Sequence, residues 1–344
     1  MSSQATQVPK TLTEQDCCSI AVLFGGATAP ALLDLGGRIY SSPSFSNMGC
    51  LMKTHQMEQH DAQMRLFQGD REFEFFLGAP NSAWLHRHPN VPLFVSRRRM
   101  PKSRFSEAVV DWALDSGGFT ELQSYGRWSI TAREYARLVN EYSEKIGRLK
   151  WAAQQDWMCE PIVINGGTAN GQVFVGTGLS VREHQSRTVD NFLELEDMCD
   201  VPVVPVIQGF TIDEYHRCIE LYSRNGVDLR LYHTVGFGSI CRRQATQEAV
   251  DILKSINKLG INIHGFGLKR EALKNVLCCL ASADSMAWSF NARYSGKTCG
   301  RINERTGKPI KNCANCYHAA VEWYEKTMQI VGLRGCIKKS EVCV

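Results

Sequence analysis

The sequence predicts an α/β protein built around a (β/α)8 TIM barrel, and three observations favour this fold. From residue 92 onward, short apolar runs alternate with amphipathic stretches of about 10 to 15 residues, which is typical of a parallel sheet covered by helices. Polar residues follow the apolar runs repeatedly. The first strands are not followed by a glycine-rich nucleotide-binding fingerprint, which favours a barrel over a doubly wound sheet.

Length and composition are those of an ordinary globular protein. The chain has 344 residues, of which 44% are hydrophobic and 22% are charged. We expect an N-terminal extension and the start of the barrel in residues 1–90, the barrel core in 91–293 and a separate segment in 294–344. No run reaches the roughly 18 apolar residues that a membrane span needs, and the first 16 residues lack a signal core, so we expect a cytoplasmic location and no membrane partner.

The elements follow in chain order from periodicity and from their boundary residues. Residues 130–148 carry apolar side chains at helical spacing, with Ser129 or Thr131 available as the N-cap, and an insertion at residues 165–180 contains glycines that indicate a loop or hairpin. We predict strands at residues 92–96, 108–114, 149–155, 201–207, 230–235 and 262–267, and further helices at 188–198, 212–224, 246–259 and 269–279.

Polar residues lie where these strands end. They are Asp115, Asp156, Gln208, Gly236, Gly267 and Asp284. In an α/β barrel the carboxyl ends of all strands face one mouth, where active sites are built. Three carboxylates there suit glycosidic chemistry, in which one attacks or stabilises the sugar carbon and another moves a proton. Taken alone, each aspartate could equally be a helix cap or a turn former.

The turn after Asp115 has the sequence Ser116-Gly117-Gly118-Phe119. Two glycines permit positive φ and close approach of a ligand to the backbone, and a phenylalanine ring can stack on a flat substrate. The alternative is a glycine turn with a buried phenylalanine.

The order of these motifs resembles the tRNA-guanine transglycosylase superfamily. The resemblance covers roughly residues 92–318, and its most specific part is the Asp-Ser-Gly-Gly-Phe motif. The other parts are Asp156 after an apolar strand, Gln208-Gly209, Val235-Gly236-Phe237-Gly238, Gly265-Phe266-Gly267, and Asp284 followed by Arg293.

The resemblance implies exchange of guanine for a 7-deazaguanine base through a covalent glycosyl-enzyme intermediate. It assigns the nucleophile to Asp284 and the general acid/base to Asp115. It implies that the base is bound by Ser116, Gly117, Phe119, Asp156, Gln208, Gly209, Gly236 and Gly238. The carboxylate of Asp156 suits the N1–H and exocyclic amine of a guanine-type base. The reacting nucleotide must leave the stack to reach such a site, so base flipping is implied.

Departures from the tRNA enzymes make the sequence most similar to the deazapurine-DNA transglycosylase (DpdA) branch of phages and bacterial DNA-modification islands. The Pro-Thr-Arg that follows the nucleophile in the tRNA enzymes is replaced here by Ser289-Phe290-Asn291. The tight three-cysteine cluster with a distant histidine of the tRNA enzymes is absent from this sequence. Arg242 occupies the place of an acidic residue that suits a cationic aminomethyl base, which favours neutral 7-cyano-7-deazaguanine (preQ0). A phage-encoded member would act in the host cytoplasm.

Basic residues fall in clusters that are far apart in the sequence. Those predicted to contact nucleic acid are Arg242, Arg243, Arg293, Lys297 and Arg301. Brought together by the fold, they would line a phosphate-binding groove. Each cluster alone is equally consistent with a solvated loop.

The cysteines near the C-terminus suggest a structural metal site. Cys299, Cys313, Cys316 and His318 provide three thiolates and an imidazole, a donor set that suits closed tetrahedral Zn2+. Cys336 and Cys343 compete with His318 for the fourth position. The remaining cysteines are scattered through apolar segments, which favours reduced thiols over disulfides.

The leading functional hypothesis is therefore a DNA-modifying transferase whose partners are DNA and a free 7-deazaguanine base. Two alternatives remain open at this point: a tRNA-guanine transglycosylase, and a zinc-stabilised barrel that binds nucleic acid without catalysis. A homodimer or accessory DNA-modification proteins are also compatible with the sequence.

Overall fold

The computed structural model describes residues 73–337 apart from 89, 170, 241, 245, 296–297 and 303–305, together with two short strands nearer the N-terminus. These strands, β1 (Leu32–Leu33) and β2 (Ile39–Tyr40), pair antiparallel. The chain divides into two compact units, Met1–Arg71 and Glu72–Val344. Most of the expected N-terminal extension, and the predicted site residue Lys297, lie outside the described residues.

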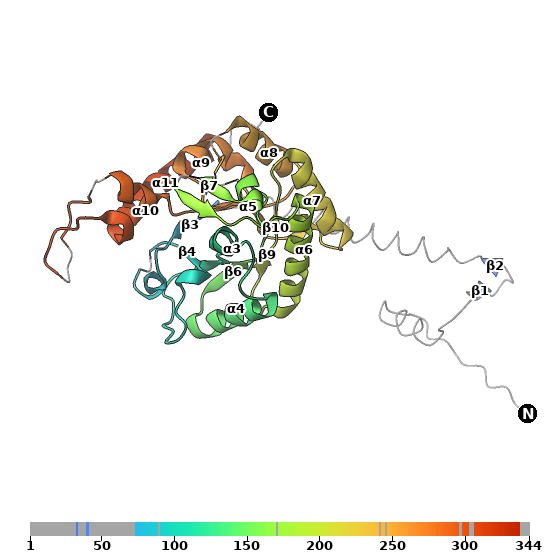
Figure 1. The fold of residues 1–344 in the computed structure, drawn as a ribbon, viewed down its shortest axis with the longest axis horizontal. Helices are drawn as coiled ribbons and strands as arrows, with labels where there is room; N and C mark the ends of the chain where they lie inside the picture. The colour runs from blue at the N-terminus through green and yellow to red at the C-terminus, as the bar shows by residue number, and fades with distance from the viewer. Residues whose placement is uncertain are drawn as a thin grey trace, which may run out of the picture. The chain divides into compact units, whose positions relative to one another are not determined.

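The second unit is a parallel barrel, seen end-on in Figure 1. Its strands run β10-β11-β12-β13-β3-β4-β5-β6-β9 around the sheet. The two ends of this order, β10 and β9, lie on either side of Pro205 in the chain. Proline has no backbone N–H, so it divides what is otherwise one strand into these two pieces, and the ring of strands closes through that strand. The bounds are β3 (Glu74–Gly78), β4 (Leu93–Ser96), β5 (Trp112–Asp115), β6 (Leu149–Ala153), β9 (Val203–Val204), β10 (Val206–Ile207), β11 (Val235–Phe237), β12 (Ile263–Gly265) and β13 (Ser282–Ser285).

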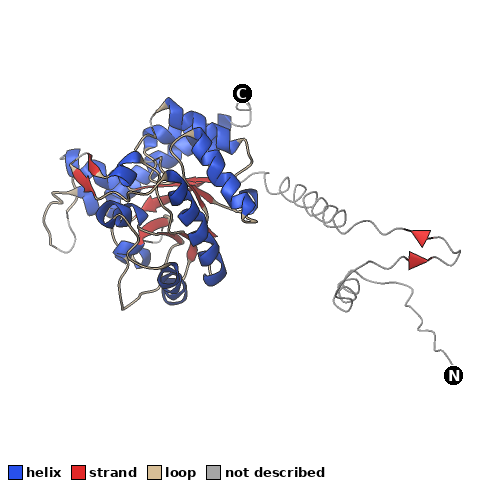
Figure 2. Cartoon of the chain, turned by 45° about the vertical axis from the view of Figure 1, so that its right-hand side comes forward, coloured by secondary structure: helices blue, strands red, loops and turns tan. Residues whose placement is uncertain are grey.

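Helices surround the strands, as Figure 2 shows. Thr131 and Thr211 each form a capping box with a glutamate three residues later, which sets where two of the helices begin. The helices are α3 (Gly118–Tyr125), α4 (Ala132–Ile146), α5 (Pro161–Asn165), α6 (Val181–Met198), α7 (Ile212–Arg224), α8 (Gln247–Asn257), α9 (Arg270–Val276), α10 (Ala287–Ser295) and α11 (Tyr317–Ile337). Short 3-10 helices occupy η1 (Ser82–His86), η2 (Arg97–Arg99), η3 (Leu229–Leu231), η4 (Leu277–Cys279) and η5 (Cys313–Asn315).

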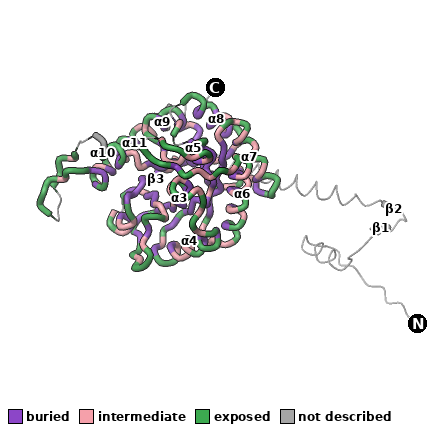
Figure 3. Tube along the Cα trace, in the orientation of Figure 1, coloured by how far each residue is buried: buried purple, intermediate pink, exposed green. Residues whose placement is uncertain are grey.

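Strand alternation divides the buried residues, drawn purple in Figure 3, into two layers. Phe75 and Leu77 of β3 point outward into the apolar layer beneath the helices. Phe76 between them points into the barrel, where it packs with Phe94 and Trp151. The barrel interior is therefore a filled aromatic core, and any site must lie at the mouth above it.

Three boundaries differ from the sequence-based expectation. The strand expected at residues 108–114 begins only at Trp112, because the amides of Ala108 and Val109 donate to Ile146 and Leu85 outside the sheet. The strand expected at residues 230–235 is β11, Val235–Phe237, because Asp228 caps the short helix η3. The helix expected at residues 188–198 is α6, which begins at Val181 because the Ser180 side chain caps it. The insertion at residues 165–180 contains a hairpin, one of its two expected forms, in which β7 (Gly167–Ala169) and β8 (Gln172–Phe174) pair antiparallel. Among the described residues, none of the helices could cross a membrane.

Candidate active site

Asp284 lies inside the barrel mouth, on β13. Its register partner on β3 is the inward-facing Phe76, and the residue is almost completely buried. The Oδ1 atom accepts a hydrogen bond from the backbone N–H of Gly267 at 2.9 Å. The same oxygen lies 3.3 Å from Nε2 of His264. Two fixed neighbours therefore orient this carboxylate.

His264, which sequence reasoning did not select, lies beside the proposed nucleophile on the neighbouring strand β12. Its imidazole is fully buried, with the ring centres of Trp151 and Phe266 at 5.0 and 4.8 Å. Its Nδ1 lies 2.8 Å from the Ser282 hydroxyl. If this hydroxyl donates to Nδ1, the ring proton resides on Nε2 and points at Asp284. The sequence signal that could have identified His264 is its place on the predicted strand at residues 262–267, where its side chain faces the barrel interior.

Asp115 ends β5 and lies in the same mouth. Burial raises the pKa of its carboxyl group, hydrogen bonds from Gly117 and Ser96 oppose this, and the nearby charge of Asp284 raises the pKa further. The backbone N–H of Gly117 donates to Oδ1 at 3.0 Å. The side chain keeps some contact with solvent, while protein atoms surround its carboxyl group. The raised pKa suits Asp115 to a role in proton transfer.

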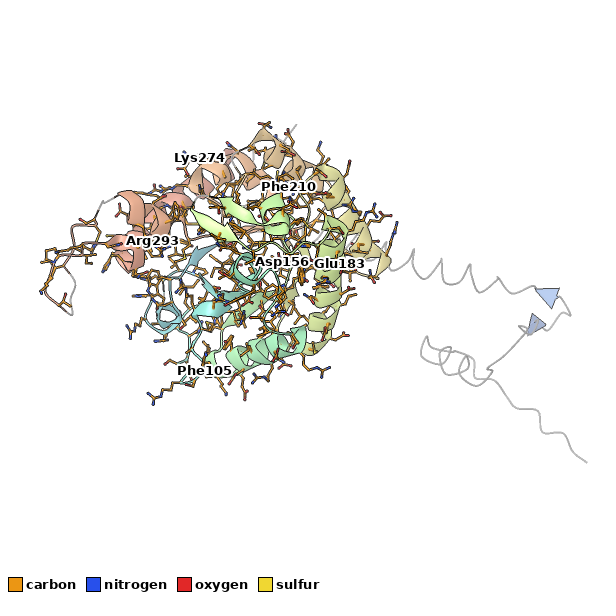
Figure 4. All side chains as sticks on the ribbon, viewed as in Figure 1. Phe105, Asp156, Glu183, Phe210, Lys274 and Arg293 are labelled. Atoms are coloured by element: carbon orange, nitrogen blue, oxygen red, sulfur yellow. The ribbon has the colours of Figure 1, made fainter. Side chains whose placement is uncertain are left out.

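Asp156 follows β6 and lies near the centre of the ring in Figure 4. Burial raises the pKa of its carboxyl group to about 7, against the opposing hydrogen bond from the Gln208 amide, and the charges of Asp115 and Glu160 add to the increase. A Cβ placed on Gly118 would lie 3.4 Å from Asp156 Oδ1 and 3.0 Å from the Trp128 ring. The glycine therefore lets the backbone of α3 approach this carboxylate.

Gln208 is buried and connects Asp156 to residues deeper in the mouth. Its Oε1 accepts from the Ser239 hydroxyl at 2.6 Å, while its Nε2 donates to Asp156. A Cβ on Gly238 would overlap the Gln208 amide, and one on Gly236 would lie 2.5 Å from the Phe266 ring. These two glycines, both predicted to bind the base, provide the space in which the glutamine and the aromatic ring lie.

Two further polar residues belong to this network and were missed by sequence reasoning. Ser239 has positive φ, 56°, and its hydroxyl lies 3.0 Å from Oε2 of Glu160. Burial raises the pKa of the Glu160 carboxyl group, and the Ser239 hydrogen bond and the charges of Arg242 and Arg243 oppose this increase. Glu160 also immediately precedes Pro161, the first residue of α5.

The remaining predicted base-binding residues have different surroundings. The Ser116 carbonyl accepts from Arg97 Nε at 3.1 Å, which anchors the turn after Asp115. Phe119 is 38% exposed, and its ring centre lies 5.9 Å from that of Phe174. A Cβ on Gly209 would lie 2.7 Å from the backbone nitrogen of Tyr215, so this glycine permits close packing of α7.

The basic residues predicted to bind nucleic acid do not form one group. The Arg242 guanidinium lies over the Phe119 and Phe174 rings at 5.0 and 4.4 Å. Arg243 pairs with Glu248 at 3.4 Å and covers the Phe210 ring, so its role is partly structural. Arg293 is exposed on α10, which Figure 4 shows to one side of the barrel. Arg301 is exposed in the segment that follows.

Cys299, Cys313 and Cys316 form a candidate metal site. Their sulfur atoms all lie within 4.8 Å of one another, and those of Cys299 and Cys316 are 3.7 Å apart. Thiolate sulfurs around a tetrahedral zinc ion are separated by about 3.8 Å, so the three residues fit such an ion. The Ser289 hydroxyl of α10 donates to the Ala314 carbonyl at 2.6 Å, which attaches this cluster to the helix that follows Asp284.

The ring nitrogens of His318, the predicted fourth ligand, do not belong to this group of candidate ligand atoms. His318 neighbours Tyr317, whose ring stacks on His88 at 3.5 Å. Burial lowers the pKa of His88, and the charges of Arg87 and His318 lower it further. The side chain of Cys336 and all of Cys343 lie outside the described residues, so the three thiols are the ligands that the described part of the chain brings together.

Residues 71–337 match the sequence model of the family DpdA, described as DeoxyPurine in DNA protein A. No curated protein matches the chain. Similar solved structures include two crystal structures titled "putative isomerase from Sinorhizobium meliloti", one in an open-loop conformation. They share 11% and 10% sequence identity with this chain, with TM-scores of 0.34 and 0.35. The alignments cover 72% and 74% of this chain but 60% and 63% of the isomerase chains, so the chain spans less than two thirds of their length.

Proposed function

The chain belongs to the DpdA family, DeoxyPurine in DNA protein A, and from that premise we propose that it exchanges guanine in DNA for a 7-deazaguanine base. The observation that carries the proposal is the meeting of Asp115, Asp156 and Asp284 in one barrel mouth, with the first two carboxyl groups at raised pKa. Such an arrangement separates a proton carrier from a fixed nucleophile, as base exchange through a covalent intermediate requires.

The first half of the reaction breaks the bond between C1′ and N9 of the target nucleotide. Both hydrogen bonds on Asp284 fall on Oδ1, so we assign the attack on C1′ to Oδ2, which forms a glycosyl ester. The bonding electrons leave with guanine, which takes a proton from Asp115. In the second half the incoming base gives its N9 proton to Asp115, N9 attacks C1′, and the Asp284 carboxylate is released.

Asp156 and Gln208 are the proposed readers of the base edge. An ionised Asp156 would accept from the N1–H and exocyclic amine, and the Gln208 amide, turned by Ser239 toward Asp156, would address the neighbouring carbonyl oxygen. Because Gln208 is buried, a base without a carbonyl oxygen at this position would leave the second amide N–H of Gln208 without an acceptor, which disfavours adenine.

Arg242 supports preQ0 as the incoming base. Its guanidinium lies at the mouth over Phe119, the ring proposed to stack on the base. A cationic aminomethyl substituent would be repelled there, whereas the neutral cyano group would not. Bound zinc would cross-link the segment after α10, and Cys299, Cys313 and Cys316 would hold it.

The test is incubation of purified protein with labelled preQ0 and either duplex DNA or tRNA, followed by mass spectrometry of the nucleosides. We expect the deazaguanine nucleoside in DNA and not in tRNA. Incorporation into tRNA alone would replace the proposal by the tRNA reaction. Absence of incorporation into both, together with DNA binding, would support a non-catalytic barrel.

A further inference from the structure

Exposed apolar side chains gather at one place on the barrel, beside the insertion hairpin β7–β8. Val173 and Val175 are 68% and 61% exposed, and Tyr125 at the end of α3 is 50% exposed. We call these three residues the α3–β8 face. Phe119, at the start of α3, borders it. The proposed chemistry assigns no role to these three side chains.

The two valines are held outward by a well-packed support. Phe174 between them is buried with Leu122 and Trp157, so strand alternation forces its neighbours to the surface. The backbone N–H of Val175 donates to the Gln123 carbonyl at 3.0 Å, and the Gln123 side chain donates to the Val173 carbonyl at 3.3 Å. The hairpin is thus fixed on α3, and the valines cannot turn inward to bury their methyl groups.

This support is continuous with the active site. Helix α3 begins at Gly118, whose Cα faces the Asp156 carboxylate, and the apolar cluster beneath the hairpin includes Trp157 and Met158, which follow Asp156. In Figure 1 the labels of α3, α5 and β7 all lie within the ring of outer helices, and in Figure 2 the hairpin projects at one side of the barrel. A substrate that places a nucleotide at Asp156 must therefore pass close to the α3–β8 face.

Charge on this part of the surface favours an anionic partner. Residues 161–182 contain no acidic residue, and in residues 116–133 the sole acid is Glu121. Glu121 is fully buried and pairs with Arg97 at 2.6 Å and Arg98 at 2.7 Å. The Arg98 guanidinium lies 5.9 Å from the centre of the Tyr125 ring. Apolar and aromatic groups beside cations, without exposed acids, suit the flat bases and phosphates of nucleic acid.

We propose that the α3–β8 face contacts the bases next to the target nucleotide and keeps the duplex open while that nucleotide occupies the barrel mouth. The two valines act as an apolar wedge against an unstacked base step, and Tyr125 stacks on an exposed base. This inference rests on the proposed function, because the occupant of the face is the same DNA strand that supplies the target guanine.

The test compares an intact duplex with the same duplex carrying an unpaired bubble around the target guanine. Val173→Ser/Val175→Ser and Tyr125→Ala are the variants. Leu231→Ser/Leu259→Ser is the matched control, since these side chains are 54% and 40% exposed and precede strands at the opposite end of the barrel. We expect about a tenfold loss of base exchange on the duplex and near-normal exchange on the bubble. The control should be unchanged on both substrates.

A second readout separates this inference from the proposed function. 2-Aminopurine beside the target guanine should brighten on binding of the wild-type protein and brighten less with the face variants, whether or not base exchange occurs. Equal losses on duplex and bubble, or wild-type fluorescence with the face variants, would overturn the wedge. If the wild-type protein brightens 2-aminopurine without exchanging any base, the transglycosylase proposal fails and the wedge stands.

Discussion

The barrel mouth and the three-thiol cluster are assembled in opposite ways. The mouth joins side chains from β5, β6, β12 and β13, which are distant in the sequence and adjacent only because the strands close into a ring. The thiol cluster is formed by Cys299, Cys313 and Cys316 on one short segment. In the mouth every carboxylate has a neighbour that fixes it, whereas the thiols would be tied together by an ion.

This difference suggests a division of labour. Carboxylates with raised pKa and oriented oxygens are arranged for reaction, and their burial costs stability. A zinc ion held by the three thiols would cross-link the segment that carries them, so we expect its contribution to be to stability. Substitutions in the mouth should therefore remove activity and leave the fold, and substitutions in the cluster should do the reverse.

Asp284→Asn should have the largest effect on base exchange. The amide cannot form the glycosyl ester, so we expect at least about a 10³-fold loss of incorporation and no protein–DNA adduct under denaturing conditions. Asp213→Asn, an exposed change on α7, is the matched control. Incorporation within tenfold of wild type would remove Asp284 from the role of nucleophile.

His264 is the next test, because its buried ring contacts Asp284. We expect His264→Leu to lower kcat by about 10- to 100-fold with little change in KM for the base, since the carboxylate loses one of two orienting hydrogen bonds. His264→Gln, which retains an N–H donor, should recover part of the loss. His216→Gln, exposed on α7, controls for histidine removal. A change in KM alone would mean that His264 shapes the base site instead.

The sequence was informative wherever local chemistry decides the structure. Helical spacing with Ser129 or Thr131 as the N-cap located α4, which Thr131 caps, and polar residues after apolar runs located Asp115, Asp156 and Asp284. It could not locate His264 or Ser239, because their contacts depend on strand register and on a positive φ, respectively. The intramolecular contacts of Arg243 could not be predicted for a related reason. A guanidinium that covers Phe210 and pairs with Glu248 looks in sequence like any exposed arginine.

Asp156 should make both base binding and stability depend on pH near 7. Its pKa is raised to about 7 in the folded protein, against about 3.9 in the unfolded chain. The contribution to stability is therefore full below pH 4 and is lost as the pH rises through 7. Base affinity should change in the opposite sense, because the ionised form accepts hydrogen bonds from the base.

Asp156→Asn removes this titration and provides the measurement. In urea unfolding, the variant should gain stability relative to wild type between pH 5.5 and 8.5, while losing affinity for preQ0 at the higher pH. Asp115 and Glu160, whose pKa values are also raised, remain in both proteins, so the pH dependence that differs between them is that of Asp156 together with its charge interaction with these two groups. A stability difference that is the same at both pH values would contradict the assignment of the titration to Asp156.

Cys313→Ser should have the smallest effect on chemistry. We expect it to lose about one bound zinc per chain and to lower the Tm by several degrees, while base exchange at 25 °C stays within a few-fold of wild type, because the thiol group includes none of the mouth carboxylates. Cys278→Ser is the matched control, as this thiol lies outside the cluster and should keep both zinc and Tm. If Cys313→Ser instead lost activity as completely as Asp284→Asn at unchanged Tm, the division between mouth and cluster would be wrong. The Ser289–Ala314 hydrogen bond would then be the connection that carries the effect to the nucleophile.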